Sequence, residues 1–322
     1  MENKILPRQL CALTFCAFTV PAVALLPRAG WLWAGIAALI AAGVVSAGTA
    51  LCRKKGGDLV ALAAQRASGR WCLRAMGAWN LLAMGAAARK LCMVYPDAGA
   101  FPLVGALLLL LAAYAAGKGV SAVVRVGAIC FFFFAALYAL VFGFALPQMH
   151  AAWMMPVTRP VWTVLPAALA AANALALTGA CRGRGRITGW LAGGVALAVL
   201  AALAAAGCVS PEVAAAEPFA FYTMSKSISL FGAMERFEAV VSAALTAGGF
   251  CLLALECLAN TQIVKRLRPG AEKLAPAGNF LLGGAAIFLA GRVPEPVLAA
   301  GTAIFWGVLP VILLSVAEHK KY

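Results

Sequence analysis

Charge is what this sequence has least of. Asp and Glu together number 11 in 322 residues, and charged residues of both signs make up 11% of the chain. Soluble domains carry about 25% charged residues, and no stretch of useful domain size here approaches that composition. The shortage excludes a soluble globular protein and predicts a single polytopic membrane domain over residues 1–322.

Histidine is also scarce, and the cysteines lack the spacings that are typical of metal or redox sites. The two histidines are His150 and His319, and neither has a catalytic neighbour pattern. The ten cysteines form no Cys-x-x-Cys pair and no Cys/His spacing of a zinc site. No Ser/His/Asp set or acid pair is placed for catalysis. We therefore expect no metal, no cofactor, no disulfide and no enzymatic activity.

Apolar residues make up what remains, at 64% of the chain. They form recurrent long runs, and a bilayer core of about 30 Å needs roughly 20 helical residues. Helix is required because hydrocarbon offers no partner to backbone N–H and C=O groups. The sequence predicts an all-α integral membrane protein with about ten transmembrane helices. The predicted spans are 9–26, 31–51, 75–95, 101–117, 122–146, 161–181, 187–208, 238–260, 275–290 and 296–316.

The basic residues lie mostly in the gaps between these spans and give the chain a formal charge of +15. With the N-terminus inside, nineteen of the Lys and Arg residues fall on the cytoplasmic side and five on the other. Cytoplasmic loops of membrane proteins carry such an excess. The charge pattern predicts cytoplasmic N- and C-termini and membrane lipid, not nucleic acid, as the surroundings.

Ten spans divide into two halves of five, over residues 9–146 and 161–316. Because five is odd, the second half starts from the opposite side, which is the geometry of a five-plus-five inverted repeat. In such folds, interrupted helices at corresponding positions of the two halves frame a midplane binding site. The first span contains Pro21 and the sixth contains Pro166, so broken first and sixth helices are expected.

A ligand is expected between spans one, three, six and eight. Backbone groups freed by Pro21 would meet its amine or carboxylate, and polar side chains of spans six and eight would add contacts. The candidate ligand-binding residues are Thr19, Val20, Pro21, Ala22, Arg89, Asn173, Thr178 and Thr246. Thr246 has an alternative interpretation, close helix packing beside Gly248 and Gly249.

Three charged residues inside spans need an explanation, because charge in hydrocarbon is costly. Arg89 either snorkels to the interface or faces the bundle to meet an anionic group. Lys90 points elsewhere on the same helix, and snorkelling is the favoured interpretation for it. Glu256 is expected to pair with Lys265 or Arg266; the alternative is a part in a proton or ion path.

The segment 218–237 is amphipathic. Ile228, Phe231, Met234 and Phe237 recur every three residues with Ser and Lys between them. This spacing predicts a helix that lies in the membrane interface before span eight.

The stretch from Tyr222 to Glu238 resembles the most specific pattern of the GerAB-type spore germination permeases, a family of the amino acid–polyamine–organocation superfamily. The matching residues are Pro218, Lys226, Ser227, Ile228, Glu235, Arg236 and Phe237. Weaker matches run along nearly the whole chain and include Ile5-Leu-Pro-Arg-Gln9 at its start. Ser121 departs from the pattern, since the family often has an acid there.

The resemblance implies ten spans in a five-plus-five inverted repeat. It also implies the B subunit of a nutrient germinant receptor in the spore inner membrane. Such a subunit would bind a small nutrient, typically an amino acid, and act with A-type and C-type subunits. Two alternatives remain open: an amino-acid/cation symporter of the same superfamily, and a non-transporting structural subunit with a vestigial pocket.

Overall fold

A computed structural model describes residues 5–92, 103–155, 164–181, 189–228 and 237–317. Every extended regular element in these ranges is a helix. The first half contains α1 (Pro7–Val20), η1 (Pro21–Leu25), η2 (Leu26–Ala29), α2 (Trp31–Lys55), α3 (Leu59–Ala63), α4 (Ala67–Cys92), α5 (Leu103–Gly117) and α6 (Val120–Ala145), followed by short 3₁₀ turns at Leu146–Gln148 and Ala151–Met154. The second half contains α7 (Leu165–Leu169), η7 (Ala170–Ala180), α8 (Trp190–Val209), α9 (Pro211–Ala216), α10 (Ala220–Ser227), α11 (Phe237–Leu267), a 3₁₀ turn at Ala271–Lys273, α12 (Ala275–Ala290), α13 (Glu295–Thr302), η10 (Ala303–Val308) and α14 (Leu309–Val316).

Within the described residues, six helical segments are long and apolar enough to cross a bilayer. They are Pro7–Ala29, Trp31–Lys55, Val120–Gln148, Trp190–Val209, Glu238–Leu267 and Glu295–Val316. The protein is therefore an all-α, multi-pass membrane protein. Three shorter apolar helices, Leu103–Gly117, Ala167–Ala180 and Ala275–Ala290, lie within further predicted spans.

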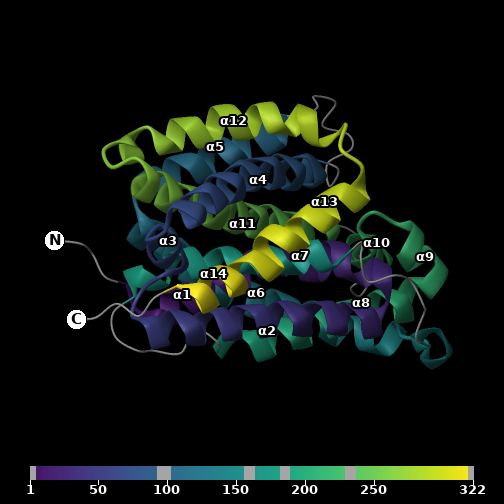
Figure 1. The fold of residues 1–322 in the computed structure, drawn as a ribbon. Coiled ribbons are helices and arrows are strands. Elements are labelled where there is room, and N and C mark those ends of the chain that lie inside the picture. Colours follow the sequence, from purple (N-terminus) through teal and green to yellow (C-terminus); the bar gives the residue numbers. More distant parts are fainter. Residues whose placement is uncertain (1–4, 93–102, 156–163, 182–188, 229–236, 318–322) are drawn as a thin grey trace.

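The helices form two groups joined through α11. In Figure 1, α4, α5 and α12 run side by side above α11, while α1, α2, α6 and α8 lie below it. The continuous α13–η10–α14 segment crosses obliquely over the front of both groups (Figure 1). The start of α1 and the end of α14 lie at the same end of the bundle.

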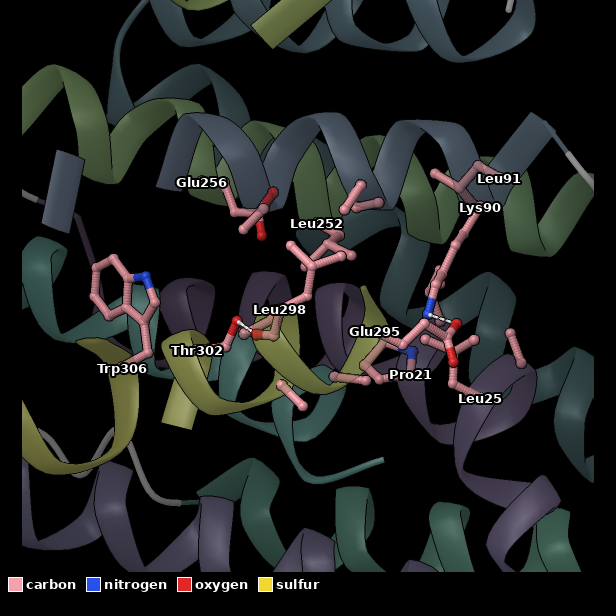
Figure 2. A pocket seen from close by; sticks show the side chains of 18 of the residues that line it. Pro21, Leu25, Lys90, Leu91, Leu252, Glu256, Glu295, Leu298, Thr302 and Trp306 are labelled. Atoms are coloured by element: carbon pink, nitrogen blue, oxygen red, sulfur yellow. Dashed lines mark hydrogen bonds and ion pairs between the residues drawn. The ribbon is translucent and has the colours of Figure 1, made fainter. Parts of the chain in front are cut away.

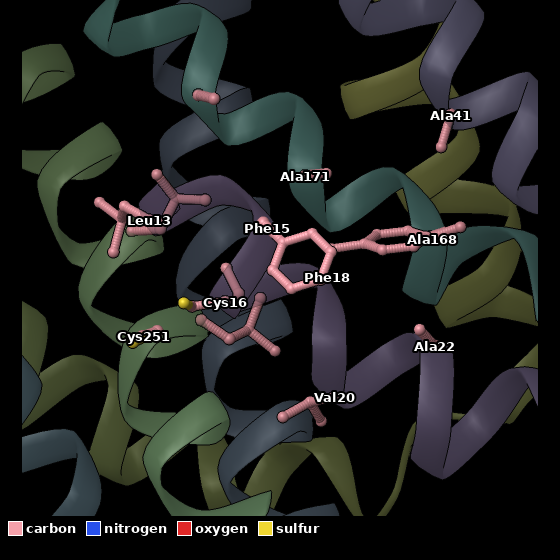
Figure 3. Packing of buried hydrophobic residues seen from close by; sticks show 14 of the residues in the cluster. Leu13, Phe15, Cys16, Phe18, Val20, Ala22, Ala41, Ala168, Ala171 and Cys251 are labelled. Atoms are coloured by element: carbon pink, nitrogen blue, oxygen red, sulfur yellow. The ribbon is translucent and has the colours of Figure 1, made fainter. Parts of the chain in front are cut away.

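The core is built around α1 and α11. The most apolar stretch of Pro7–Ala29 is 83% buried and that of Glu238–Leu267 is 72% buried, against 28% for Val120–Gln148. Figure 3 shows Cys16 of α1 beside Cys251 of α11, in the buried cluster that also contains Phe18, Val20 and Ala168 of α7. Large apolar side chains elsewhere point outward. Examples are Leu39, Leu107, Leu111, Ile129, Phe132, Leu281 and Phe288. An apolar exterior of this extent is what a lipid-facing surface requires.

Small residues let the α4–α12 pair pack closely. A Cβ added to Gly85 would collide with the backbone of Ala286 on α12. Small residues at such crossings are how membrane helices approach each other, because lipid gives no hydrophobic drive for association. Gly85 therefore sets the α4–α12 spacing.

Three buried asparagines tie α4, α11 and α12 together. Asn80 Nδ2 donates to the Glu256 carbonyl at 3.0 Å and to Asn260 Oδ1 at 3.3 Å. Asn260 Nδ2 donates to Asn279 Oδ1 at 3.4 Å, and Asn279 Nδ2 donates to the Cys257 carbonyl at 3.0 Å. Interhelical amide bonds of this kind hold bundles together in lipid. They also hold the Glu256 turn of α11 against α4.

Lys55 joins the ends of α2 and α14. Gly56 ends α2 in the left-handed conformation, with φ at 70°. The Lys55 side chain is buried, and its Nζ donates to the carbonyls of Ser315, at 2.8 Å, and Ala317. A cation placed on the last carbonyls of a helix satisfies orphan acceptors and complements the helix dipole.

The start of the chain is attached to the end of η7. The Ile5 N–H donates to the Ala180 carbonyl at 3.0 Å, and Ile5 forms an isolated parallel bridge with Cys181. Gln9 Oε1 accepts the Leu6 N–H at 3.1 Å and closes the first turn of α1.

Candidate functional site

A cavity of about 120 Å³ lies where the interrupted α1 and α7–η7 segments meet α4, α11 and α13–η10. A single buried water occupies about 10–15 Å³ by a comparable measure, so the space exceeds one water severalfold. The lining residues are Val20, Pro21, Ala24, Leu25, Ala83, Ala86, Ala87, Lys90, Leu91, Ala167, Ala170, Asn173, Phe219, Leu252, Glu256, Glu295, Leu298, Ala299, Thr302 and Trp306. Figure 2 shows it from close by.

Pro21 makes the first interruption. Proline has no N–H to donate to the carbonyl four residues earlier, here Ala17, so the regular helix cannot continue through it. The chain passes into a π-helical turn, Pro21–Leu25, and then into a 3₁₀ turn, Leu26–Ala29. This change of pitch bends the segment beside the cavity, which Pro21 lines. The α-helix of the predicted first span thus ends before Pro21, and the chain continues in π and 3₁₀ turns to Ala29.

The sixth predicted span is interrupted in a different way. Only the five residues Leu165–Leu169 are α-helical, and the next eleven, Ala170–Ala180, form a 3₁₀ helix. Runs of 3₁₀ helix beyond three or four residues are uncommon and often mark functional hinges. Asn173 Nδ2 donates to the Ala170 carbonyl at 3.0 Å. Its Oδ1 is buried and has no hydrogen-bond partner among the described residues.

Glu256 supplies the buried acid of the cavity. Its side chain is 2% exposed, and within the described ranges no group bonds to its Oε2. Figure 2 shows the carboxyl group directed from α11 toward the space between Leu252 and Leu298. A carboxylate without a partner in hydrocarbon is costly, and such residues in membrane proteins usually mark a ligand or ion site. The Asn80 bond to the Glu256 carbonyl fixes the backbone that carries this carboxyl group.

The α13–η10 segment contributes the opposite wall. Trp306 is 1% exposed, and its Nε1 donates to no acceptor in the described part of the chain. Thr302 is already engaged: its Oγ1 accepts from Trp79 Nε1 at 3.2 Å and donates to the Leu298 carbonyl at 2.9 Å. The threonine hydroxyl therefore holds α13 against α4, whereas the indole N–H of Trp306 is available to a ligand.

An ion pair closes one end of the cavity. Lys90 Nζ lies 3.4 Å from Glu295 Oε1, with the two side chains 37% and 62% exposed. In Figure 2 this pair is at the opposite end of the cavity from Trp306. Glu295 begins α13 and the chain runs from it to the end of α14. The pair therefore lies toward the end of the bundle away from the termini.

The structure brings together three of the eight candidate ligand-binding residues: Val20, Pro21 and Asn173 line the cavity. Thr19 and Ala22 are fully buried in the packing of α1, and Thr19 donates to the Cys16 carbonyl at 2.6 Å. The remaining three candidates, Arg89, Thr178 and Thr246, are not among the lining residues.

Thr178 and Thr246 bond within their own helices. Thr178 donates to the Leu175 carbonyl at 3.1 Å and Thr246 to the Ser242 carbonyl at 2.8 Å. The alternative of close packing fits the neighbourhood of Thr246. A Cβ added to Gly248 would lie 2.8 Å from Thr19 Oγ1 and 2.9 Å from Val20 Cγ2.

Two interpretations of charged residues differ from what the structure has. Arg89 carries its guanidinium to Gly291, just past α12, while its neighbour Lys90 lines the cavity. The expectation that Glu256 pairs with Lys265 or Arg266 is wrong, because its carboxyl group lies in the cavity. Nine residues of helix span about 13 Å, which is too far for such a pair.

The residues of the family-like motif lie apart from the cavity. Lys226 is exposed, with its Nζ 4.7 Å from the Tyr222 ring centroid, and Ile228 is buried. Ser227 ends α10 and Phe237 begins α11. Glu235 and Arg236 lie outside the described residues, as does most of the amphipathic stretch after Ile228. That segment remains a prediction.

No family model matches this chain, and no curated protein matches it. The described ranges bring together no group of three His, Cys, Asp or Glu side chains able to hold a metal ion. Function must therefore be argued from the geometry of the cavity.

Proposed function

We propose that this protein is the permease-like B subunit of a nutrient germinant receptor, which binds a small nutrient such as an amino acid in this cavity. One observation carries the proposal. A cavity at the junction of two interrupted helices holds three buried polar atoms without partners among the described residues: Glu256 Oε2, Asn173 Oδ1 and Trp306 Nε1. Buried polar groups are normally paired, so a ligand that pairs them is favoured.

The proposal includes ten crossings with both termini in the cytoplasm. Beyond the six long apolar helices, α5, Ala167–Ala180 and α12 lie within three of the remaining predicted spans, and α4 overlaps the fourth, 75–95, as far as Cys92. A helix of 16 residues such as α12 is about 24 Å long, close to the hydrocarbon thickness. The shared end of α1 and α14 agrees with an even number of crossings. Interruptions in the first and sixth of these segments are what a five-plus-five inverted repeat would have.

In the proposed mechanism the nutrient enters past Lys90 and Glu295 from the outer side. It binds more tightly to one arrangement of the η1 and η7 segments than to another, and so shifts the equilibrium between them. A-type and C-type partner subunits respond to that shift. Lipid covers the apolar exterior.

The test is binding to the purified protein in lipid nanodiscs. Amino acids are screened by the shift that they cause in the unfolding temperature, because a ligand at 100 times its Kd stabilises by about 2.7 kcal/mol. An Asn173→Leu variant should lose the response. A panel without effect on the wild type would contradict the proposal and favour the structural subunit with a vestigial pocket.

One observation favours a second candidate, the amino-acid/cation symporter. Glu256 is a buried acid in the cavity, and acids in such positions often serve proton or ion coupling in transporters. Proteoliposomes with an imposed proton or sodium gradient would accumulate labelled amino acid if the protein transports. A Glu256→Gln variant would abolish gradient-driven uptake. Binding without uptake separates the receptor subunit from the symporter.

A further inference from the structure

We propose that the cavity selects its ligand by a protonated amine, which Glu256 and Asn173 bind, and that a carboxylate on the ligand is dispensable. The inference rests on the proposed function, because it names the chemical group that the nutrient-binding cavity recognises. The site should therefore bind small aliphatic ammonium compounds and should not bind carboxylic acids that lack an amine.

The charges around the cavity support this choice. Three charged side chains line it: Lys90, Glu256 and Glu295. Lys90 and Glu295 pair with each other at 3.4 Å, so their charges balance. Glu256 is left as the buried carboxyl group whose Oε2 has no partner in the part of the chain described. A cationic ligand group compensates this carboxylate, whereas an anionic group faces a charge of its own sign.

The unpartnered polar atoms are mostly acceptors. An ammonium group has three donors and no acceptor. Glu256 Oε2 and Asn173 Oδ1 are both buried acceptors on the cavity wall. The Asn173 amide donates to the Ala170 carbonyl, so its oxygen is the atom left for a ligand. Both acceptors, one from α11 and one from η7, match the N–H donors of an amine.

Donors for a carboxylate are fewer at this wall. Among the side chains that line the cavity in the described ranges, Trp306 Nε1 is the buried donor without a partner. One indole N–H can hold one oxygen, of a carboxylate or of a hydroxyl group. It gives no bidentate recognition of the kind an arginine provides. Arg89, the residue best suited to a carboxylate, has its guanidinium at Gly291.

The rest of the lining determines the size and polarity of the part of the ligand beyond its amine. Beyond the polar atoms the wall is alanine and aliphatic side chains, including Val20, Leu25, Leu252 and Leu298. Together with a volume of about 120 Å³, this favours a short branched or unbranched aliphatic chain. Burial of that chain adds to the affinity through the hydrophobic effect.

The experiment compares matched probes that share one aliphatic body. Each set contains an amino acid, its decarboxylated amine and its deaminated acid: alanine, ethylamine and propanoate; valine, isobutylamine and 3-methylbutanoate; leucine, isopentylamine and 4-methylpentanoate. Binding to the full chain in nanodiscs is measured at pH 7 by titration calorimetry and by the unfolding temperature. We expect the amino acid and the amine of at least one set to bind, and the acid not to bind.

Glu256→Gln keeps the shape of the side chain and removes its charge. Removing one charge of a buried pair mainly speeds dissociation, so amine affinity should fall by about 30-fold or more. The control is Glu212→Gln, the same change on the exposed α9, which should bind like the wild type. The unfolding temperature of each variant without ligand shows whether it is folded. Glu256→Asp provides a second variant that retains the charge and should keep part of the affinity.

The outcomes separate the two proposals. If no probe binds to the wild type, the nutrient-binding function is contradicted, and the amine inference with it. If an amino acid binds but its amine does not, or the acid binds equally well, the cavity binds nutrients but does not select the amine. Unchanged amine binding by folded Glu256→Gln also overturns the inference.

Discussion

Lys90 Nζ lies 3.4 Å from Glu295 Oε1, and this pair joins the last turn of α4 to the first residue of α13 at the mouth of the cavity. Both side chains are partly exposed, and ion pairs in such surroundings contribute little to stability. The position of the pair, rather than its strength, gives it significance. In the proposed mechanism the ligand passes these two side chains, so their separation would ease its entry and release.

Replacing Glu295 by Gln should therefore affect kinetics more than stability. We expect a change of less than about 1 kcal/mol in the free energy of unfolding. The dissociation rate of a bound amino acid, measured by stopped-flow or surface plasmon resonance, should rise. Lys90→Met should act in the same direction. A large loss of stability with an unchanged dissociation rate would show that the pair is structural and does not limit access.

Lys55 provides a test of the packing between α2 and α14. Lys55→Met removes the donor to the Ser315 and Ala317 carbonyls, and bonds from charged groups contribute about 1.5–3 kcal/mol. We expect destabilisation of that size in denaturant unfolding from mixed micelles. Lys54, exposed and adjacent, is the matched control, and Lys54→Met should be neutral. Equal effects of the two changes would contradict the capping role.

The asparagine network should behave as one unit. Asn260→Leu removes its bonds to both Asn80 and Asn279 and should cost about 1–2 kcal/mol. Adding Asn279→Leu should cost less than it does alone, because the partner is already gone. Thr14→Val is the control, since that buried hydroxyl bonds within its own helix, to the Leu10 carbonyl, and has no part in the network. Strict additivity of the two asparagine changes would argue against the network.

Two glycines should respond oppositely to an added side chain. Gly85→Val forces side-chain atoms into the backbone of Ala286 and should destabilise the protein by about 1–3 kcal/mol. Gly43 on α2 has no atom within 4 Å of an added Cβ, so Gly43→Ala should be neutral or stabilising. Unfolding temperatures of the two variants give the comparison. Similar stability of Gly85→Val and wild type would mean that α4 and α12 are not closely packed.

The proposed topology can be tested with reporter fusions. Alkaline phosphatase joined after Arg186 or Arg268 should be inactive, and green fluorescent protein at the same points should fluoresce, because both sites are expected in the cytoplasm. Fusion after Arg292 should give the reverse pattern. Phosphatase activity behind Arg186 or Arg268 would exclude the ten-crossing arrangement.

The helical class of the fold follows from the sequence, and so does the place of one interruption. Long apolar runs can satisfy their backbone in lipid only as helices, and Pro21 cannot continue one. Asn173 was also predictable, as a polar residue in a second interrupted span. The long 3₁₀ stretch of η7 was not, because its alanine-rich sequence has high intrinsic helix propensity and packing overrides it.

The charged and aromatic walls of the cavity were harder to predict. Arg89 and Lys90 point about 100° apart on one helix, and the neighbouring helices decide which of the two faces the cavity. Trp306 lies in a continuous apolar run, so its sequence surroundings gave no sign of a binding site. Glu256 could have been recognised, since no basic residue lies within one helical turn of it.

The bond from the Ile5 N–H to the Ala180 carbonyl couples the backbone before α1 to the end of η7, and under the proposed function this link acquires a role. Asn173 lines the cavity from the first half of the same 3₁₀ segment that ends at Ala180. A nutrient that draws Asn173 inward would pull on the extreme N-terminal backbone at the membrane surface. A neighbouring subunit that bound the backbone at Ile5 would respond to an occupied cavity without contacting the interior of the bundle.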